Sequence, residues 1–252
     1  MSALPSWPEG HDKVILATTD STLSEAQRRF AAGVTRPLWI LALHQTAARG
    51  RRGRPWAMPE GNFAANLILP TSDRPDRLAL RSFIASLALA DACVAATGRT
   101  DGFTLKWPND VLLNGGKLAG ILIESLQSGG HTAGASIGIG VNLAVAPGAT
   151  EVEARALRPV ALIEAGAQPT PEEFLDLLAP AYARYETQFA TYGFAPIRTE
   201  WLNRAAHLGD TITARTGTNE TTGTFETIDE TGRLILTTPQ GRQAIAAADI
   251  FF

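Results

Sequence analysis

The sequence predicts an α+β protein of two domains, a larger one over residues 1–206 and a small all-β one over residues 207–252. Three observations predict this division. Strand and helix patterns alternate up to about residue 207, three strand patterns joined by glycine-rich turns follow one another in mid-chain, and the tail holds only short alternating segments rich in Thr and Gly. With 252 residues, 45% of them hydrophobic, the chain can bury a full core.

The first elements alternate between strand and helix. KVILATTD predicts a strand and STLSEAQRRFAAG a helix, in which Thr22 and Glu25 have the spacing of a capping box and Gly33 is the stop signal. Further strands are predicted in PLWILALHQ and NFAANLILP, on either side of an arginine-rich loop. Apolar residues then recur at helical spacing over residues 76–97, which predicts a long core helix.

The middle of the chain predicts a meander of strands. FTLKWPNDVLL, KLAGILIES and ASIGIGVNLAV follow one another, with NGG and QSGGH as hairpin turns. Helices are expected over residues 151–166, 171–192 and 196–204. The tail then breaks into four short strands, DTITAR, TGTFETID, RLILTTP and RQAIAAA, which are spaced like those of a small barrel.

Composition limits the class of protein. The 22 Lys and Arg against 25 Asp and Glu give a net charge of −3, so any anion binding must come from a local cluster. Cys93 is the only cysteine, which excludes an internal disulfide and fits a reducing compartment. The N-terminus lacks the pattern of a signal peptide, and the most apolar window, FIASLALADACVAA, is short and interrupted by Asp91. We therefore expect a cytoplasmic protein with no membrane partner.

The stretch RGRRGRPW, residues 49–56, is such a local cluster. Its arginines are forked donors that match phosphate or carboxylate, its glycines let a backbone approach a ligand, and Trp56 can stack on a flat heterocycle. Together these features suggest a nucleotide site. A solvated loop or an arginine-rich contact to nucleic acid would use the same residues, and the loop alone does not separate these interpretations.

A second stretch, KWPNDVLLNGGKLAGILIES, helps to decide between these interpretations of the loop. Lys106 and Lys117 are compact cations for phosphate oxygens, and Asn109 and Asp110 are suited to hold a metal-bound nucleotide. Taken singly, these residues are equally typical of a capped turn and an edge lysine. In IGIGVN, two glycines two apart on a strand clear one face for a ligand or another backbone. The conjunction of these stretches with the arginine loop favours the nucleotide site.

The chain resembles the biotin protein ligases over nearly its whole length. Three motifs carry the resemblance in family order: DST at 20–22, RGRRGRPW at 49–56, and KWPNDV followed by KLAGILIE within 106–124. IGIGVNL and the barrel-like tail are weaker support. The resemblance implies a class-II-synthetase-like catalytic domain of the biotin/lipoate ligase type with a mixed sheet, over 1–206, and an SH3-like barrel, over 207–252. It also implies that the enzyme joins biotin to ATP as biotinyl-AMP, with Mg²⁺, and transfers biotin to one lysine of a biotin carboxyl carrier domain.

The same resemblance implies a set of site residues. The biotin positions are Ser21, Thr22, Gln45, Arg49, Gly50, Arg51, Lys117, Gly120, Leu122, Gly138 and Gly140. The nucleotide positions are Arg51, Trp56, Lys106, Asn109, Asp110, Lys117 and Asn142, and no residue is named as a direct metal ligand. Lys117 matches the family's central lysine, between the biotin carboxylate and the α-phosphate, and Arg49 and Arg51 are expected to assist it. Leu23 and Ala48 depart from the usual Asn and Gly, which affects the contacts to biotin and the stiffness of the loop.

The chemistry implied by the resemblance accounts for the cations. A carboxylate and a phosphate about 4 Å apart repel by roughly 4 kcal/mol at an effective dielectric constant near 20, and Arg49, Arg51 and Lys117 would offset this. A lipoate-type ligase shares the fold and the adenylate chemistry, and a nucleic-acid-binding protein that uses RGRRGR is an alternative of another class. About 20 residues precede DST, too few for the winged helix of repressor members, so we expect no DNA binding. Monomers and sheet-edge dimers both occur in the family, so the resemblance allows a homodimer without requiring one.

Overall fold

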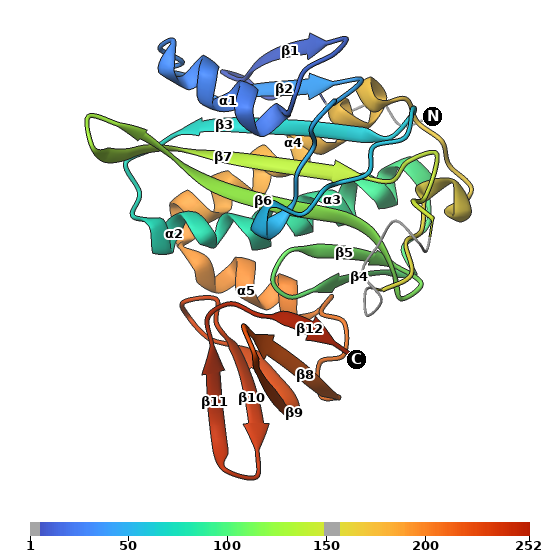
Figure 1. The fold of residues 1–252 in the computed structure, drawn as a ribbon, viewed down its shortest axis with the longest axis vertical. Coiled ribbons are helices and arrows are strands. Elements are labelled where there is room, and N and C mark those ends of the chain that lie inside the picture. The colour runs from blue at the N-terminus through green and yellow to red at the C-terminus, as the bar shows by residue number, and fades with distance from the viewer. Residues whose placement is uncertain (1–5, 149–156) are drawn as a thin grey trace.

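The computed structural model describes residues 6–148 and 157–252 and contains two sheets (Figure 1). The larger is seven-stranded, in the order β1-β2-β3-β7-β6-β5-β4, and is mixed because β1 and β2 are parallel while the other neighbours are antiparallel. Its strands are β1 (Asp12–Leu16), β2 (Leu38–Ala42), β3 (Phe63–Pro70), β4 (Phe103–Lys106), β5 (Asp110–Leu113), β6 (Gly116–Ser128) and β7 (His131–Val141). Together with the helices, this confirms the α+β class.

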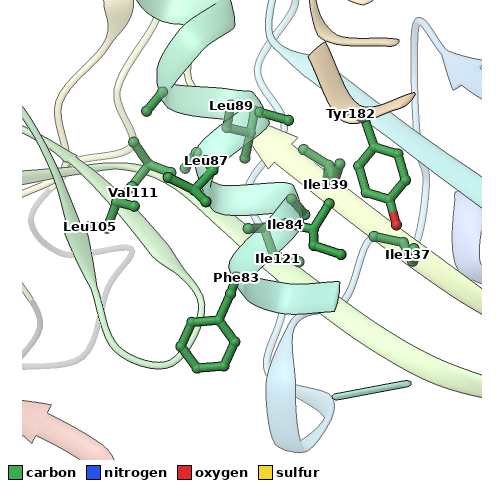
Figure 2. Close-up of a cluster of buried hydrophobic side chains, with 14 of the residues drawn as sticks. Phe83, Ile84, Leu87, Leu89, Leu105, Val111, Ile121, Ile137, Ile139 and Tyr182 are labelled. Atoms are coloured by element: carbon green, nitrogen blue, oxygen red, sulfur yellow. The ribbon is translucent and has the colours of Figure 1, made fainter. Parts of the chain in front are cut away.

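Helices cover both faces of the larger sheet. They are α1 (Thr22–Ala31), α2 (Pro75–Ala79), α3 (Arg81–Thr97), α4 (Pro171–Tyr192) and α5 (Phe194–Leu202). The main core lies between the sheet and α3 and α4, as Figure 2 shows for side chains of α3, of the strands and Tyr182 of α4. On the other face, α1 buries Ala26 against Leu38, Ile40, Ile68 and Leu126. The stretch Pro75–Thr97 has the length and apolar composition of a membrane span, but 72% of its most apolar window is buried inside the protein, as in a core helix.

The second sheet is antiparallel and lies at one end of the molecule (Figure 1). Its order is β11-β10-β9-β8-β12, and its strands are β8 (Thr211–Thr216), β9 (Asn219–Ile228), β10 (Leu234–Thr238), β11 (Gly241–Ile245) and β12 (Asp249–Phe251). Four of these strands overlap the predicted ones, with ends that differ by up to three residues, and β12 is an addition. The buried indole of Trp107 donates a hydrogen bond of 2.9 Å to the carbonyl oxygen of Gly232, which fixes this sheet beside the β4–β5 turn.

The predicted turns of the meander are confirmed. Asn114 and Gly115 both have positive φ, 48° and 78°, between β5 and β6, and Gly129 and Gly130 have φ of 58° and 80° between β6 and β7. Two consecutive residues with positive φ are characteristic of the type I′ turn, whose twist matches that of the strands it joins. These two tight turns place β5, β6 and β7 side by side and so build the floor of the site described below.

Several element boundaries differ from the prediction. FTLKWPNDVLL forms two strands, β4 and β5, that pair with each other, and the helix predicted over 76–97 is interrupted at Leu80. The helix expected at 196–204 begins earlier, at Phe194, and ends at Leu202. The N-cap of α1 is Ser21, not Thr22: the Ser21 hydroxyl accepts a hydrogen bond of 3.2 Å from the Leu23 amide, and Thr22 is the first helical residue.

The helix predicted over 151–166 is wrong for its described part. Residues 151–156 lie outside the described residues, and within 157–166 only Leu162–Ala165 forms a short 3₁₀ turn. The reason is a backbone pairing. The amide of Lys117 donates to the carbonyl oxygen of Arg158 over 2.8 Å, and the amide of Val160 donates to the carbonyl oxygen of Lys117 over 3.0 Å. These bonds hold the segment extended beside the start of β6, where a helix cannot form.

Candidate active site

One cavity of about 380 Å³ lies where the larger sheet, the arginine loop and β12 meet. Every residue that the sequence analysis assigned to biotin or to the nucleotide lines it. These residues are Ser21, Thr22, Gln45, Arg49, Gly50, Arg51, Trp56, Lys106, Asn109, Asp110, Lys117, Gly120, Leu122, Gly138, Gly140 and Asn142. Residues that are up to 121 positions apart in the chain, from Ser21 to Asn142, therefore face a common space.

The floor of the cavity is a patch of sheet without side chains. Gly120 of β6 and Gly140 of β7 are direct cross-strand partners. The indole of Trp56 lies on this pair: a Cβ at Gly140 would stand 2.7 Å from its Cε2, and one at Gly120 would stand 3.2 Å from its Cζ3. Because Cβ atoms do not approach other atoms to 2.7 Å, the indole can occupy this position only above a glycine. The two glycines thus create room for a flat ring.

A second cross-strand pair, Leu122 and Gly138, continues the floor toward the N-terminus of α1. Leu23 is 3% exposed, and its Cδ2 would stand 3.0 Å from a Cβ at Gly138. Leu23, which stands where the family usually has Asn, therefore packs into the space that Gly138 leaves open. It makes this end of the cavity apolar.

The first turn of α1 supplies polar groups beside that apolar end. The Thr22 amide donates a hydrogen bond of 2.7 Å to Oε1 of Gln45, while Nε2 of Gln45 lies 3.3 Å from Sδ of Met58. Ser21 is buried, and its hydroxyl caps the helix. A helix N-terminus carries a partial positive charge. This end of the cavity therefore presents fixed hydrogen-bonding groups next to an apolar wall.

Cations gather around a single buried carboxylate on the opposite side. Nζ of Lys117 lies 2.8 Å from Oδ1 of Asp110, and the two form an ion pair without hydrogen-bond geometry. The same Nζ lies 5.7 Å from the centre of the Trp56 ring. Burial lowers the pKa of Lys106, although the nearby charge of Asp110 acts in the opposite direction. Five positive side chains (Arg49, Arg51, Arg54, Lys106 and Lys117) line the cavity with two carboxylates (Asp110 and Asp249), so the site has a surplus of positive charge suited to an anion.

The arginine loop is held by specific partners. Nη2 of Arg49 donates to both carboxylate oxygens of Glu124, over 3.2 and 3.1 Å, and Nη1 of Arg51 donates to Oδ1 of Asn109 over 3.2 Å. Arg52 and Arg54 both contact Asp249 on β12, at 2.7 and 3.3 Å. Arg49 and Arg51 are thus oriented by neighbours in β6 and in the β4–β5 turn, and Arg52 and Arg54 are tied to β12.

Sequence reasoning missed Glu124 as a partner of Arg49 and missed the contribution of β12 entirely. Ala248, Asp249, Ile250 and Phe251 all line the cavity, although they lie in the smaller domain. The motif KLAGILIE contains Glu124, so the family pattern offered a signal for that residue. No local pattern marks Asp249, whose loop partners are 195 and 197 positions away.

The donor set fits a magnesium ion that is bound together with phosphates. No group of three or more His, Cys, Asp or Glu that could hold a metal occurs in residues 6–148 and 157–252. Mg²⁺ on a nucleotide commonly uses one or two carboxylates and the phosphate oxygens, which requires no such group. Asp110 lines the cavity, and Oδ1 of Asn142 is a buried acceptor with no hydrogen-bond partner among the described residues.

Comparison with known proteins places this site in a family. Residues 15–142 match the model of the biotin/lipoate A/B protein ligase family, and residues 207–252 match that of the biotin protein ligase C terminal domain. The chain is 55% identical to a biotin–acetyl-CoA-carboxylase ligase of Paracoccus denitrificans, over 94% of this chain and 99% of that protein. It is 30% identical to the bifunctional ligase/repressor BirA of Bacillus subtilis, over 95% of this chain and 72% of that protein.

Solved structures agree on the fold. Biotin protein ligase from Aquifex aeolicus in complex with biotin and ATP superposes with a TM-score of 0.80 at 23% identity, covering 95% of this chain and 98% of the other. The structure from Leishmania major in complex with biotinyl-5-AMP has a TM-score of 0.64 at 20% identity, covering 95% of this chain and all of that one. Both family models and the similarity to the Paracoccus protein over nearly the whole of both chains lead to one conclusion. The chain belongs to the biotin/lipoate A/B protein ligase family, and within it to the biotin protein ligases.

Proposed function

We propose that this protein is an ATP-dependent, AMP-forming ligase that activates biotin as biotinyl-5′-AMP and then forms a carbon–nitrogen bond between biotin and a lysine of a biotin carboxyl carrier domain. The observation that carries the proposal is the gathering of all the motif residues around one cavity rich in cations. The 55% identity with the Paracoccus ligase supports the same activity. We assign the catalytic domain to residues 1–206 and the C-terminal barrel domain to residues 207–252.

We assign the two ends of the cavity to the two substrates. Biotin would lie at the apolar end, beside Leu122, Gly138 and Gly140, with Ser21, Thr22 and Gln45 next to its polar ring. ATP would lie toward Lys106, Asn109 and Asp110, with its adenine against Trp56. Arg49, Gly50, Arg51, Lys117 and Gly120 lie between these ends, where the carboxylate of biotin and the α-phosphate must meet.

The first reaction is an attack by a carboxylate oxygen of biotin on the α-phosphorus, which breaks the bond to pyrophosphate. Two anions must approach each other, and Lys117 with Arg49 and Arg51 would offset their repulsion and stabilise the charge in the transition state. Mg²⁺, when bound by the phosphates with Asp110, would neutralise part of the triphosphate charge. Asn109 orients Arg51 through its Oδ1, and Glu124 orients Arg49.

In the second reaction the amine of the carrier lysine attacks the biotinyl carbonyl carbon, AMP leaves with the bonding electrons, and the new amide nitrogen loses a proton to solvent. The mixed anhydride would react with water if the cavity were open. The arginine loop, with Trp56 at its end, covers the glycine floor and would exclude water from it. The loop therefore has two tasks, binding charge and shielding the intermediate.

A lipoate-type ligase is the nearest alternative, and substrate choice tests it. Pyrophosphate exchange into ATP should depend on biotin and not on lipoate. The decisive experiment uses biotin, ATP, Mg²⁺ and a biotin carboxyl carrier domain, with the mass of the carrier measured after incubation. A carrier without added biotin mass, or pyrophosphate release that does not depend on biotin, would contradict the proposal.

We further propose that the protein binds no operator DNA, is cytoplasmic and uses no membrane. The loop arginines that would contact nucleic acid are engaged with Glu124, Asn109 and Asp249, and the net charge is −3. A gel shift with biotin-operator DNA at physiological salt should show no complex. A homodimer stays a prediction that light scattering would check, with β1, at the edge of the larger sheet, as the strand to examine.

A further inference from the structure

The smaller domain places one carboxylate against the arginine loop of the larger domain. Oδ2 of Asp249 accepts from Arg52 at 2.7 Å and Arg54 at 3.3 Å, and from Arg215 of β8 at 3.5 Å. The neighbouring carbonyl oxygen, of Ala248, accepts from Nη2 of Arg51 at 3.4 Å. Three residues of the loop thus contact two consecutive residues of β12 and the segment before it.

This contact is poised to hold the loop in one position. The side chain of Asp249 is only 15% exposed, and a carboxylate buried to that degree needs cations around it. Burial acts to raise the pKa of Asp249, but the charges of Arg52 and Arg54 outweigh it and the pKa lies below its ordinary value. The carboxylate is therefore ionised at neutral pH, and the contact is between full charges.

Arg52 can hold the loop without taking part in ligand binding. It does not line the cavity, whereas Arg49, Arg51 and Arg54 do. Its backbone has a φ of 58° within the 3₁₀ turn Arg51–Gly53, and its guanidinium donates to Asp249. A side chain that reaches the other domain and not the ligand space is suited to position the loop.

We propose that Asp249 is a positioning residue that latches the arginine loop closed through Arg52, so that the C-terminal domain controls how long the acyl adenylate is retained. This inference rests on the proposed function, since it concerns the intermediate of that reaction. With the latch in place, Arg49 and Arg51 face the cavity and Trp56 covers the glycine floor. Without it, the loop opens more often and the adenylate escapes.

The test compares Asp249→Asn and Arg52→Gln with the wild type and the double variant. Glu226→Gln is the matched control, because Glu226 forms an exposed ion pair of 2.7 Å with Arg242 in the same domain, away from the cavity. Asp249→Glu keeps the charge and should rescue. Two quantities are measured in each protein: amide hydrogen exchange of the peptide spanning residues 48–56 without ligands, and the rate at which preformed biotinyl-AMP dissociates.

We expect each single variant to raise both rates roughly fivefold to tenfold, as for loss of one partly exposed charged contact. The double variant should add little to Asp249→Asn, because that substitution already removes the Arg52 contact together with those to Arg54 and Arg215. Loop exchange and adenylate dissociation at wild-type rates in a folded Asp249→Asn and a folded Arg52→Gln would overturn the latch. Equal effects in Glu226→Gln would also overturn it, by showing a general loosening of the domain. If the wild type makes no biotinyl-AMP, the proposed function fails, whereas loop exchange still tests the contact.

Discussion

Replacing Lys117 by Met removes the cation that lies between the two ends of the cavity. In the structure its Nζ is 2.8 Å from Oδ1 of Asp110, whose side chain is 12% exposed. The repulsion between the biotin carboxylate and a phosphate about 4 Å apart is roughly 4 kcal/mol at an effective dielectric constant near 20. Arg49 and Arg51 remain to offset part of it. We therefore expect adenylation to slow by a factor on the order of 10² to 10³, the effect of losing one preorganised electrostatic donor.

The assay is single-turnover formation of biotinyl-AMP at saturating ATP and biotin, because this rate isolates the chemical step from substrate binding. The matched control is Lys13→Met, since Lys13 also pairs with an aspartate at 2.7 Å but lies on the edge strand β1, outside the cavity. The control should change stability by no more than about 0.5 kcal/mol and leave the rate unchanged. A folded Lys117→Met protein that adenylates biotin at the wild-type rate would refute the reasoning and leave Arg49 and Arg51 as the central cations.

Three further predictions follow from other contacts. Arg51→Gly should release biotinyl-AMP, so that bystander proteins become biotinylated; labelling as selective as that of the wild type, measured by mass spectrometry, would argue against a retaining role. Gly140→Ala should displace the Trp56 indole, which would lie 2.7 Å from the new Cβ, and should weaken ATP binding about tenfold, by a cost of overpacking near 1.4 kcal/mol; unchanged tryptophan fluorescence and ATP affinity would contradict this. Burial lowers the pKa of His11, with the charge of Asp12 opposing it. The folded state therefore disfavours the charged imidazole, and stability should fall as pH drops below about 6.5, where the unfolded state takes up the proton; a His11→Gln variant with the same pH dependence of the free energy of unfolding would exclude this residue as the cause.

The sequence predicts the parts of the fold that depend on local patterns. The two type I′ turns and the strands that they join follow from neighbouring residues, whereas the cavity positions in RGRRGRPW and KLAG follow from the resemblance to the biotin protein ligases. The N-cap was displaced by one position because Ser21 and Thr22 both carry hydroxyls that can cap a helix, and only the backbone angles decide between them. The extended segment at 158–160 could not be foreseen, because its partner is the backbone of Lys117 about 40 residues away. For the same reason Asp249 was missed: its contacts join residues almost 200 positions apart.

The glycine floor has a consequence for the amount of enzyme in a cell. Gly120, Gly138 and Gly140 remove side chains from the middle of the sheet, and glycine inside a strand weakens it. Trp56 and Leu23 cover these glycines, and a bound ligand adds contacts that only the folded sheet can make. A ligand present at 100 times its Kd stabilises the folded state by about 2.7 kcal/mol. Proteases act on the unfolded fraction, so the lifetime of the protein should lengthen when its substrate is plentiful and shorten when it is scarce.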